Sequence, residues 1–107
     1  MGPGFARLEV VSATEPAWSV YLVRCGDGAL YTGIATDVER RLAEHSAGRG
    51  AKFLRGRGPL SLVFERGVAD HGTALRMEYA VKQLSRQRKE ALIRGDLAWA
   101  AIRPGGD

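Results

Sequence analysis

The feature that most constrains the fold of this chain is a glycine-rich turn between two segments of β-forming residues. Trp18 to Arg24 and Leu30 to Ala35 are rich in β-branched and aromatic side chains. Gly26-Asp27-Gly28 lies between them, and its glycines can adopt the positive φ that a tight hairpin requires. We therefore expect two antiparallel strands joined by this turn, with Tyr21 on the first strand and Tyr31 on the second.

The length of the turn decides which faces the two tyrosines occupy. We predict a three-residue turn, which pairs Val23 with Tyr31 and Tyr21 with Gly33. Both hydroxyl groups would then project from one face of the sheet. A two-residue turn would shift the register by one and send the tyrosines to opposite faces. In the predicted register Gly33 leaves a notch opposite Tyr21, where a substrate backbone could approach closely.

The patterns after the hairpin predict an α+β fold, in which helices flank a small, mostly antiparallel three-stranded sheet. Helix caps, apolar periodicity and glycine-rich stretches mark the remaining elements. These elements are a helix over about 37–47, a loop over 48–59, a strand over 60–66, a long helix from Asp70 and a last helix from Ser85 to Arg94. The predicted order is therefore β-β-α-β-α-α.

The length of 107 residues gives room for one domain. We assign residues 1–16 to a loosely held leader, 17–95 to the folded domain and 96–107 to a C-terminal tail. Cys25 is the only cysteine and cannot form an internal disulfide, and no apolar run approaches the length of a membrane span. We therefore expect a cytoplasmic protein that does not associate with membranes.

Positive charge is concentrated in the middle of the chain. The whole sequence has a net charge of +4, but six cations and a single acid, Glu44, lie between positions 40 and 57. This stretch is the best candidate for a surface that faces phosphate groups. The alternative is an ordinary solvated helix face and loop. The residues we assign to nucleic-acid binding are Arg40, Arg49, Lys52, Arg55 and Arg57.

Two polar side chains of the first predicted helix share one of its faces. Arg41 and His45 are four positions apart, next to an apolar stripe. A strand that leads directly into this helix could bring them to the same concave surface as Tyr21 and Tyr31. Taken singly, Arg41 also fits a solvated helix arginine, and His45 a surface histidine or one that caps the helix C-terminus.

Glu78 lies at the border of the apolar face of the long helix. It follows the apolar Met77 and stands four positions before Lys82. A carboxylate at such a position needs a partner. Lys82 could supply it as an i, i+4 ion pair. The functional alternative is Mg²⁺, which proteins commonly hold with one or two carboxylates while water and substrate phosphate complete the coordination.

These residues resemble the GIY-YIG nucleases over about positions 18–94. Ser19-Val20-Tyr21 stands at the first signature of that family and Tyr31-Thr32-Gly33 at the second, followed by Arg41, His45 and Glu78. The match is closest to the small, single-domain bacterial members. The resemblance implies a DNA endonuclease that uses one Mg²⁺ or Mn²⁺ at Glu78, with Arg41 on the scissile phosphate. It also implies that a tyrosine helps to activate water, with His45 as an alternative base or relay.

The chain departs from the family pattern at several positions. Ser19 replaces the first glycine, Thr32 replaces the isoleucine of the second signature, and the sequence contains no asparagine, whereas many members carry one after the metal glutamate. With no appended DNA-binding domain, we expect low sequence specificity, recognition of DNA shape, breaks or branches, and a role in DNA repair or processing. Two alternatives stay open: a nucleic-acid-binding module with little catalysis, and a protein-interaction domain.

Overall fold

The computed structural model describes residues 17–103, so the leader predicted for residues 1–16 lies outside the described part of the chain. The elements follow the predicted order, with two short 3₁₀ helices added. They are β1 (Trp18–Arg24), β2 (Leu30–Ala35), α3 (Val38–Ser46), η1 (Lys52–Leu54), β3 (Ser61–Val68), α4 (His71–Lys82), α5 (Arg86–Arg94) and η2 (Trp99–Ala101). The predicted loop over 48–59 therefore contains one helical turn.

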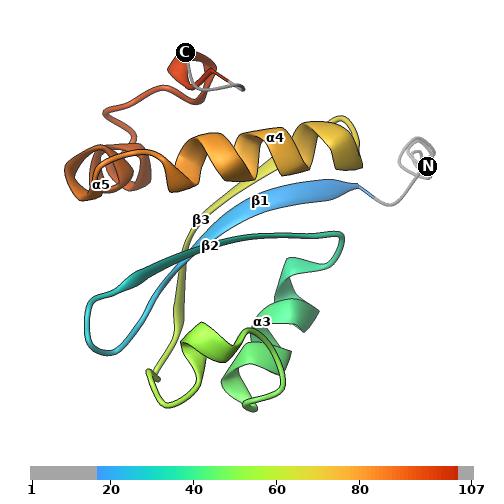
Figure 1. Cartoon of the computed structure of the whole chain (residues 1–107), viewed down its shortest axis with the longest axis vertical. Helices are drawn as coiled ribbons and strands as arrows, with labels where there is room; N and C mark the ends of the chain where they lie inside the picture. Colours follow the sequence, from blue (N-terminus) through green and yellow to red (C-terminus); the bar gives the residue numbers. More distant parts are fainter. Residues whose placement is uncertain (1–16, 104–107) are drawn as a thin grey trace, which may run out of the picture.

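The sheet has the order β2-β1-β3, and both pairings are antiparallel. Figure 1 shows α4 and α5 on one side of this sheet and α3 on the other. The fold is thus α+β, as predicted. Strand β2 is an edge strand, so one side of its backbone has no strand neighbour.

The hairpin between β1 and β2 has the predicted three-residue turn. The Cys25 N–H donates to the Ala29 carbonyl oxygen over 2.8 Å, and Gly28 has a φ of 90°, which a residue with a side chain rarely adopts. As a result Tyr21 pairs with Gly33, and Val23 pairs with Tyr31. The predicted register is confirmed.

A short polar side chain caps the N-terminus of each of the three α-helices. Asp37 caps α3 by accepting from the Arg40 N–H, Asp70 caps α4 and Ser85 caps α5. Gly95 ends α5 in the left-handed conformation. These caps explain why the helix starts could be predicted to within a residue or two.

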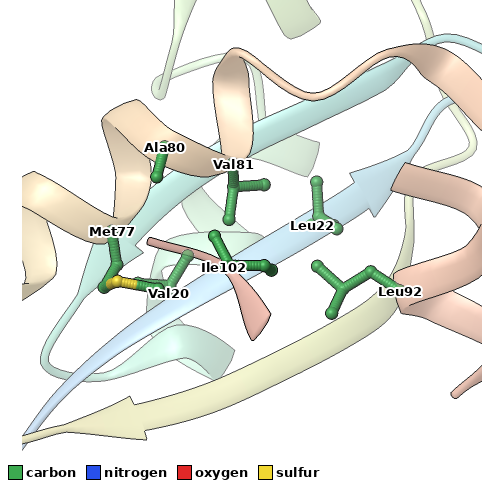
Figure 2. Close-up of a cluster of buried hydrophobic side chains, with 7 residues drawn as sticks. All are labelled: Val20, Leu22, Met77, Ala80, Val81, Leu92 and Ile102. Carbon is green, nitrogen blue, oxygen red and sulfur yellow. The ribbon is translucent and has the colours of Figure 1, made fainter. Parts of the chain in front are cut away.

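The larger core lies between the sheet and α4 and α5. Figure 2 shows its seven buried residues, which come from β1, α4, α5 and the segment after α5: Val20, Leu22, Met77, Ala80, Val81, Leu92 and Ile102. Leu97 and Trp99 also pack against this cluster. The folded structure therefore extends to Ile102, beyond the domain boundary predicted at residue 95. Within residues 17–103, the helices are too short or too polar to span a lipid bilayer.

Candidate active site

The proposed site residues of β1 and β2 lie on the face of the sheet that α3 covers. Tyr21 is 1% exposed, and its ring folds across Gly33. A Cβ added to Gly33 would lie 2.6 Å from the Tyr21 hydroxyl oxygen. The notch expected to admit a substrate backbone is therefore filled by the tyrosine itself. Glycine at this position lets the phenol cross the edge strand.

His45 reaches the Tyr21 hydroxyl from α3. The two groups are joined by a 2.9 Å hydrogen bond between Tyr21 Oη and His45 Nε2. The Ala51 N–H donates to His45 Nδ1 over 3.0 Å, so Nδ1 carries no proton. In the neutral imidazole the proton is then on Nε2, which donates to Tyr21. Both ring nitrogens are thus engaged, which favours a relay or positioning role over that of a base toward water.

The loop after α3 passes directly over the His45 ring. A Cβ built on Gly50 would lie 1.9 Å from His45 Nδ1, so a side chain at this position requires a shift of the loop or the ring. His45 itself is 3% exposed. The sequence did not distinguish this buried, doubly bonded histidine from a surface or capping residue. The close approach of backbone to ring explains the need for glycine at position 50.

Burial shifts the protonation equilibria of both partners toward their neutral forms. Burial raises the pKa of Tyr21 to about 12, with the neighbouring Tyr31 adding to the increase and Arg41 opposing it. Burial, with a smaller contribution from Arg41, lowers the pKa of His45 below its ordinary value. At neutral pH the pair is therefore an uncharged phenol and an uncharged imidazole.

Arg41 stands beside this pair and is held by a carboxylate of its own helix. Its guanidinium Nη1 donates to Glu44 Oε1 over 3.0 Å. Arg41 also lies near enough to Tyr21 to lower the pKa of the phenol by charge and hydrogen bonding. Arg41 thus interacts with Tyr21, and part of its hydrogen-bonding capacity is directed to Glu44.

Glu78 approaches from α4, on the other side of the edge strand. Its side chain is 19% exposed and forms an ion pair with Lys82 at 3.3 Å. The negative charge of Glu78 makes a small contribution to the raised pKa of Tyr21. Residues 17–103 contain no cluster of three or more His, Cys, Asp or Glu side chains suited to a metal. Glu78 is therefore not part of a three-ligand cluster within these residues, and a single carboxylate of this kind suits a mostly hydrated Mg²⁺.

Tyr31 belongs to an aromatic group that extends to the surface. Its ring centroid lies 5.5 Å from that of His45, 6.4 Å from Tyr21 and 6.1 Å from Phe53. Within the described residues its hydroxyl group forms no hydrogen bond to the protein. Phe53, from η1, is 45% exposed, and its sequence context did not identify it as a site residue. An aromatic residue directly after Lys52 in a basic loop was the only sequence feature that could have indicated a role for Phe53 in nucleic-acid binding.

Arg57 supports this aromatic group. Its guanidinium lies 4.2 Å from the Phe53 ring centroid, donates to the Phe53 carbonyl oxygen over 2.7 Å and pairs with Asp27 at 2.6 Å. Asp27 is part of the hairpin turn, so these contacts connect that turn to η1. Arg57, which we expected to face nucleic acid, is thus engaged in internal contacts that position Phe53 and the neighbouring Tyr31.

The other predicted DNA-facing cations lie on the surface. Arg49, Lys52 and Arg55 are exposed in the loop after α3, and they form no ion pair within residues 17–103. Arg40 is exposed on α3, where its side chain keeps 76% of its accessible surface and lies 3.7 Å from Glu44. Three exposed cations therefore follow the C-terminal end of α3, and Arg40 lies near its N-terminal end.

Comparison with known proteins places this arrangement in a family. The UPF0213 protein of Cronobacter sakazakii (strain ATCC BAA-894) is 52% identical over 86 residues, covering 80% of this chain and 90% of that protein. The UPF0213 protein of Yersinia pestis (strain Pestoides F) is 58% identical over 80 residues, covering 75% and 84%. A solution NMR structure of a protein from E. faecalis matches 74% of this chain and 84% of that chain, with 33% identity and a TM-score of 0.53.

A family model described as the GIY-YIG catalytic domain matches residues 17–91. This range contains β1, β2, α3, β3 and α4, together with the five site residues Tyr21, Tyr31, Arg41, His45 and Glu78. The fold, the order of these residues and the similarity to known proteins agree, and the chain belongs to the GIY-YIG family.

Proposed function

We propose that this protein is a metal-dependent endonuclease that hydrolyses DNA phosphodiester bonds with low sequence specificity. The observation that carries the proposal is the convergence at the edge of β2. There the Tyr21–His45 hydrogen bond of 2.9 Å, the guanidinium of Arg41 and the charge of Glu78 act on the same phenol. A phosphodiester held at this edge would lie near the guanidinium of Arg41, the hydroxyl of Tyr31 and the carboxylate of Glu78, while the Tyr21 hydroxyl is buried.

Arg41 is the group suited to bind the scissile phosphate. In-line attack places additional negative charge on the phosphoryl oxygens, and a guanidinium at the site stabilises that charge. Arg41 currently donates to Glu44 through Nη1, which leaves other N–H donors of the guanidinium for a phosphate. Glu44 would then hold the guanidinium in a fixed orientation while the phosphate binds.

Tyr21 is suited to orient water through its hydroxyl proton. Because Tyr21 Oη accepts from His45 Nε2, its own proton is available for a further hydrogen bond. With a pKa of about 12, ionisation at neutral pH would cost about 7 kcal/mol. The phenol therefore acts as a neutral donor in the protein alone. Tyr31, whose hydroxyl makes no hydrogen bond to residues 17–103, is the second group that could contact the water.

Glu78 would hold the divalent ion, Mg²⁺ or Mn²⁺. The fit rests on a half-buried carboxylate whose protein partner is a single lysine at 3.3 Å, an ion pair that a divalent ion can replace. A bound ion would supply positive charge that stabilises the phosphoryl oxygens and the leaving oxygen. The exposed cations of the loop after α3 would contact neighbouring phosphates without reading the base sequence. A cytoplasmic role in DNA repair or processing is consistent with such activity.

Incubation with linear, nicked and branched DNA plus Mg²⁺ or Mn²⁺ tests the proposal. We expect metal-dependent cleavage, and we expect Glu78→Gln and Arg41→Gln each to reduce its rate by about 10²- to 10³-fold. Glu39→Gln and Arg94→Gln are matched controls, because Glu39 is an exposed acid of α3 and Arg94 ends α5 on the other face of the sheet. No cleavage of any substrate, or cleavage that survives both site variants, would contradict the proposal.

A second candidate function is DNA binding without turnover. The absence of a three-ligand metal cluster within residues 17–103 and the absence of asparagine from the sequence favour it. This function predicts salt-sensitive binding that needs no divalent ion and is unaffected by Glu78→Gln. The same variant therefore separates the two candidates, since the endonuclease depends on it and the binding module does not.

A further inference from the structure

A groove lies beside the candidate active site, where β2 leads into α3. Its volume is about 390 Å³, which is within the range of small-molecule sites and suits a single nucleotide rather than a duplex. Ile34 and Thr36 line it from the end of β2, and Arg40 and Arg41 line it from α3. Arg41 lines this groove and is also the proposed ligand of the scissile phosphate, so the groove is continuous with the proposed phosphate site.

Two stacked aromatic rings also line this groove. The Trp18 and His71 ring centroids are 4.2 Å apart, and the ring planes differ by 22°. Trp18 begins β1 and His71 begins α4, so the stack joins two elements at the mouth of the groove. His71 is exposed, and Trp18 is partly exposed. A nucleobase could extend this stack on an outer ring face, because bases stack on aromatic side chains irrespective of sequence.

The charges in the groove also suit one nucleotide. Asp37 and Glu44 line it, but Asp37 accepts the Arg40 N–H as the cap of α3, and Glu44 accepts from Arg41. Both carboxylates are therefore engaged within α3. The guanidinium of Arg40 lies at an exposed rim, 3.7 Å from Glu44, and can contact the phosphate of the next nucleotide.

We propose that this groove binds an unpaired nucleobase adjacent to the scissile phosphate, by stacking it on the Trp18–His71 pair. The proposal rests on the proposed endonuclease function, since Arg41 sets the position of the phosphate. A base within a duplex is stacked on both sides and cannot enter a groove of this size, whereas a base at an overhang, flap or gap can. The groove would thus select DNA structure and not DNA sequence.

Tryptophan fluorescence tests this subsite without requiring cleavage. The chain contains two tryptophans, so Trp99→Phe leaves Trp18 as the only one. Trp99 stacks on Phe64 at 5.7 Å in the other core, and phenylalanine retains that packing. This variant is titrated, without divalent ions, with a blunt duplex and with duplexes that carry a single-stranded overhang. We expect the overhang to quench Trp18 and to bind about 5- to 150-fold more tightly than the blunt duplex.

An abasic overhang is the decisive control, because it keeps the phosphates and lacks the bases. We expect it to bind like the blunt duplex and to leave Trp18 unquenched. Trp18→Ala and the exposed His71→Ala should each reduce the preference for unpaired DNA. Equal quenching by blunt and overhanging DNA, or equal binding of normal and abasic overhangs, would overturn the subsite. Quenching without metal-dependent cleavage would leave the subsite standing and overturn the endonuclease, whereas cleavage without quenching would do the reverse.

Discussion

Tyr21 and Leu22 are adjacent in β1 and almost equally buried, yet they enter two different environments. Leu22 joins an apolar cluster with residues of α4 and α5, in which no polar group needs a partner. Tyr21 enters the α3 face, where its hydroxyl binds the buried His45. We infer that burial on the apolar face provides most of the stability, whereas the α3 face holds buried polar groups in fixed positions.

Truncation on the apolar face should have the largest effect on stability. Leu22→Ala removes a fully buried side chain from the α4 face, and we expect it to lower the free energy of unfolding by about 2–5 kcal/mol. Urea denaturation measures this loss. Cleavage by the folded fraction should stay near that of the unmodified protein. A loss of less than about 1 kcal/mol would show that the two faces do not divide their roles in this way.

The corresponding change on the α3 face is Tyr21→Phe. It keeps the packing of the ring but leaves the His45 N–H without its acceptor, which we expect to cost about 1–3 kcal/mol of unfolding free energy. Cleavage should fall far more than this loss of stability explains. The measurement compares cleavage rates at a temperature where both proteins are fully folded. Unchanged cleavage would remove Tyr21 from the proposed mechanism.

Gly50→Ala tests how closely the loop is fitted to His45. The new Cβ would lie 1.9 Å from His45 Nδ1, so the loop must move and the Ala51 hydrogen bond must weaken. We expect a loss of about 1–3 kcal/mol and reduced cleavage. Gly67→Ala is the control, because its nearest neighbour, the Trp18 carbonyl oxygen, is 4.0 Å away. If the two substitutions have the same effect, the loop does not position His45.

The register of the hairpin could be predicted because it depends on local chemistry. The glycines around Asp27 permit a three-residue turn, and the turn sets every pairing up to Tyr21 and Gly33. The helix starts could be predicted for the same reason, since each cap bonds a backbone group three residues away. That register puts Tyr21 and Tyr31 on one face of the sheet, and the helical spacing of Arg41 and His45 puts both on one face of α3.

What the sequence did not reveal depends on contacts between distant residues or on side-chain orientation. Arg57 pairs with Asp27, thirty positions away, and no local pattern predicts that partner. Strand pairing alone predicts an open space above Gly33, but the Tyr21 side chain occupies that space. Ile102 packs on the core from a segment whose composition is typical of a tail.

Low pH should reduce the stability of the protein because His45 becomes protonated. Its pKa in the folded protein lies below its ordinary value of about 6.5, so the unfolded chain takes up the proton first. This contribution to stability is complete above about pH 6.5 and decreases as the pH falls below it. The ring faces Tyr21, Arg41 and Glu44, and protonation would also break its bond from Ala51. Urea denaturation from pH 8 to 5 should show this dependence, and His45→Gln should remove it.

The smallest effect should come from the polar contact at the rim of the apolar face. Glu90 accepts two 2.7 Å hydrogen bonds from Arg24 and one of 3.0 Å from Arg86, and these bonds lower its pKa to about 2. Its contribution to stability is therefore present above its ordinary pKa of about 4.5 and is lost as the pH falls toward 2. We expect Glu90→Gln to reduce stability slightly at pH 7 and to flatten the acid limb of a urea denaturation series below pH 4.5.

The effect of Glu90→Gln is expected to be small because the partners are solvated. The side chains of Arg24 and Glu90 keep 33% and 25% of their accessible surface, so water can replace the lost bonds. When the Tyr21 hydroxyl is removed, water cannot replace the lost hydrogen bond, since His45 is buried. If Glu90→Gln destabilises the protein as much as Tyr21→Phe does, burial does not explain the difference between the two faces. If it leaves cleavage unchanged while Tyr21→Phe abolishes it, the polar groups of the α3 face are the ones that serve the reaction.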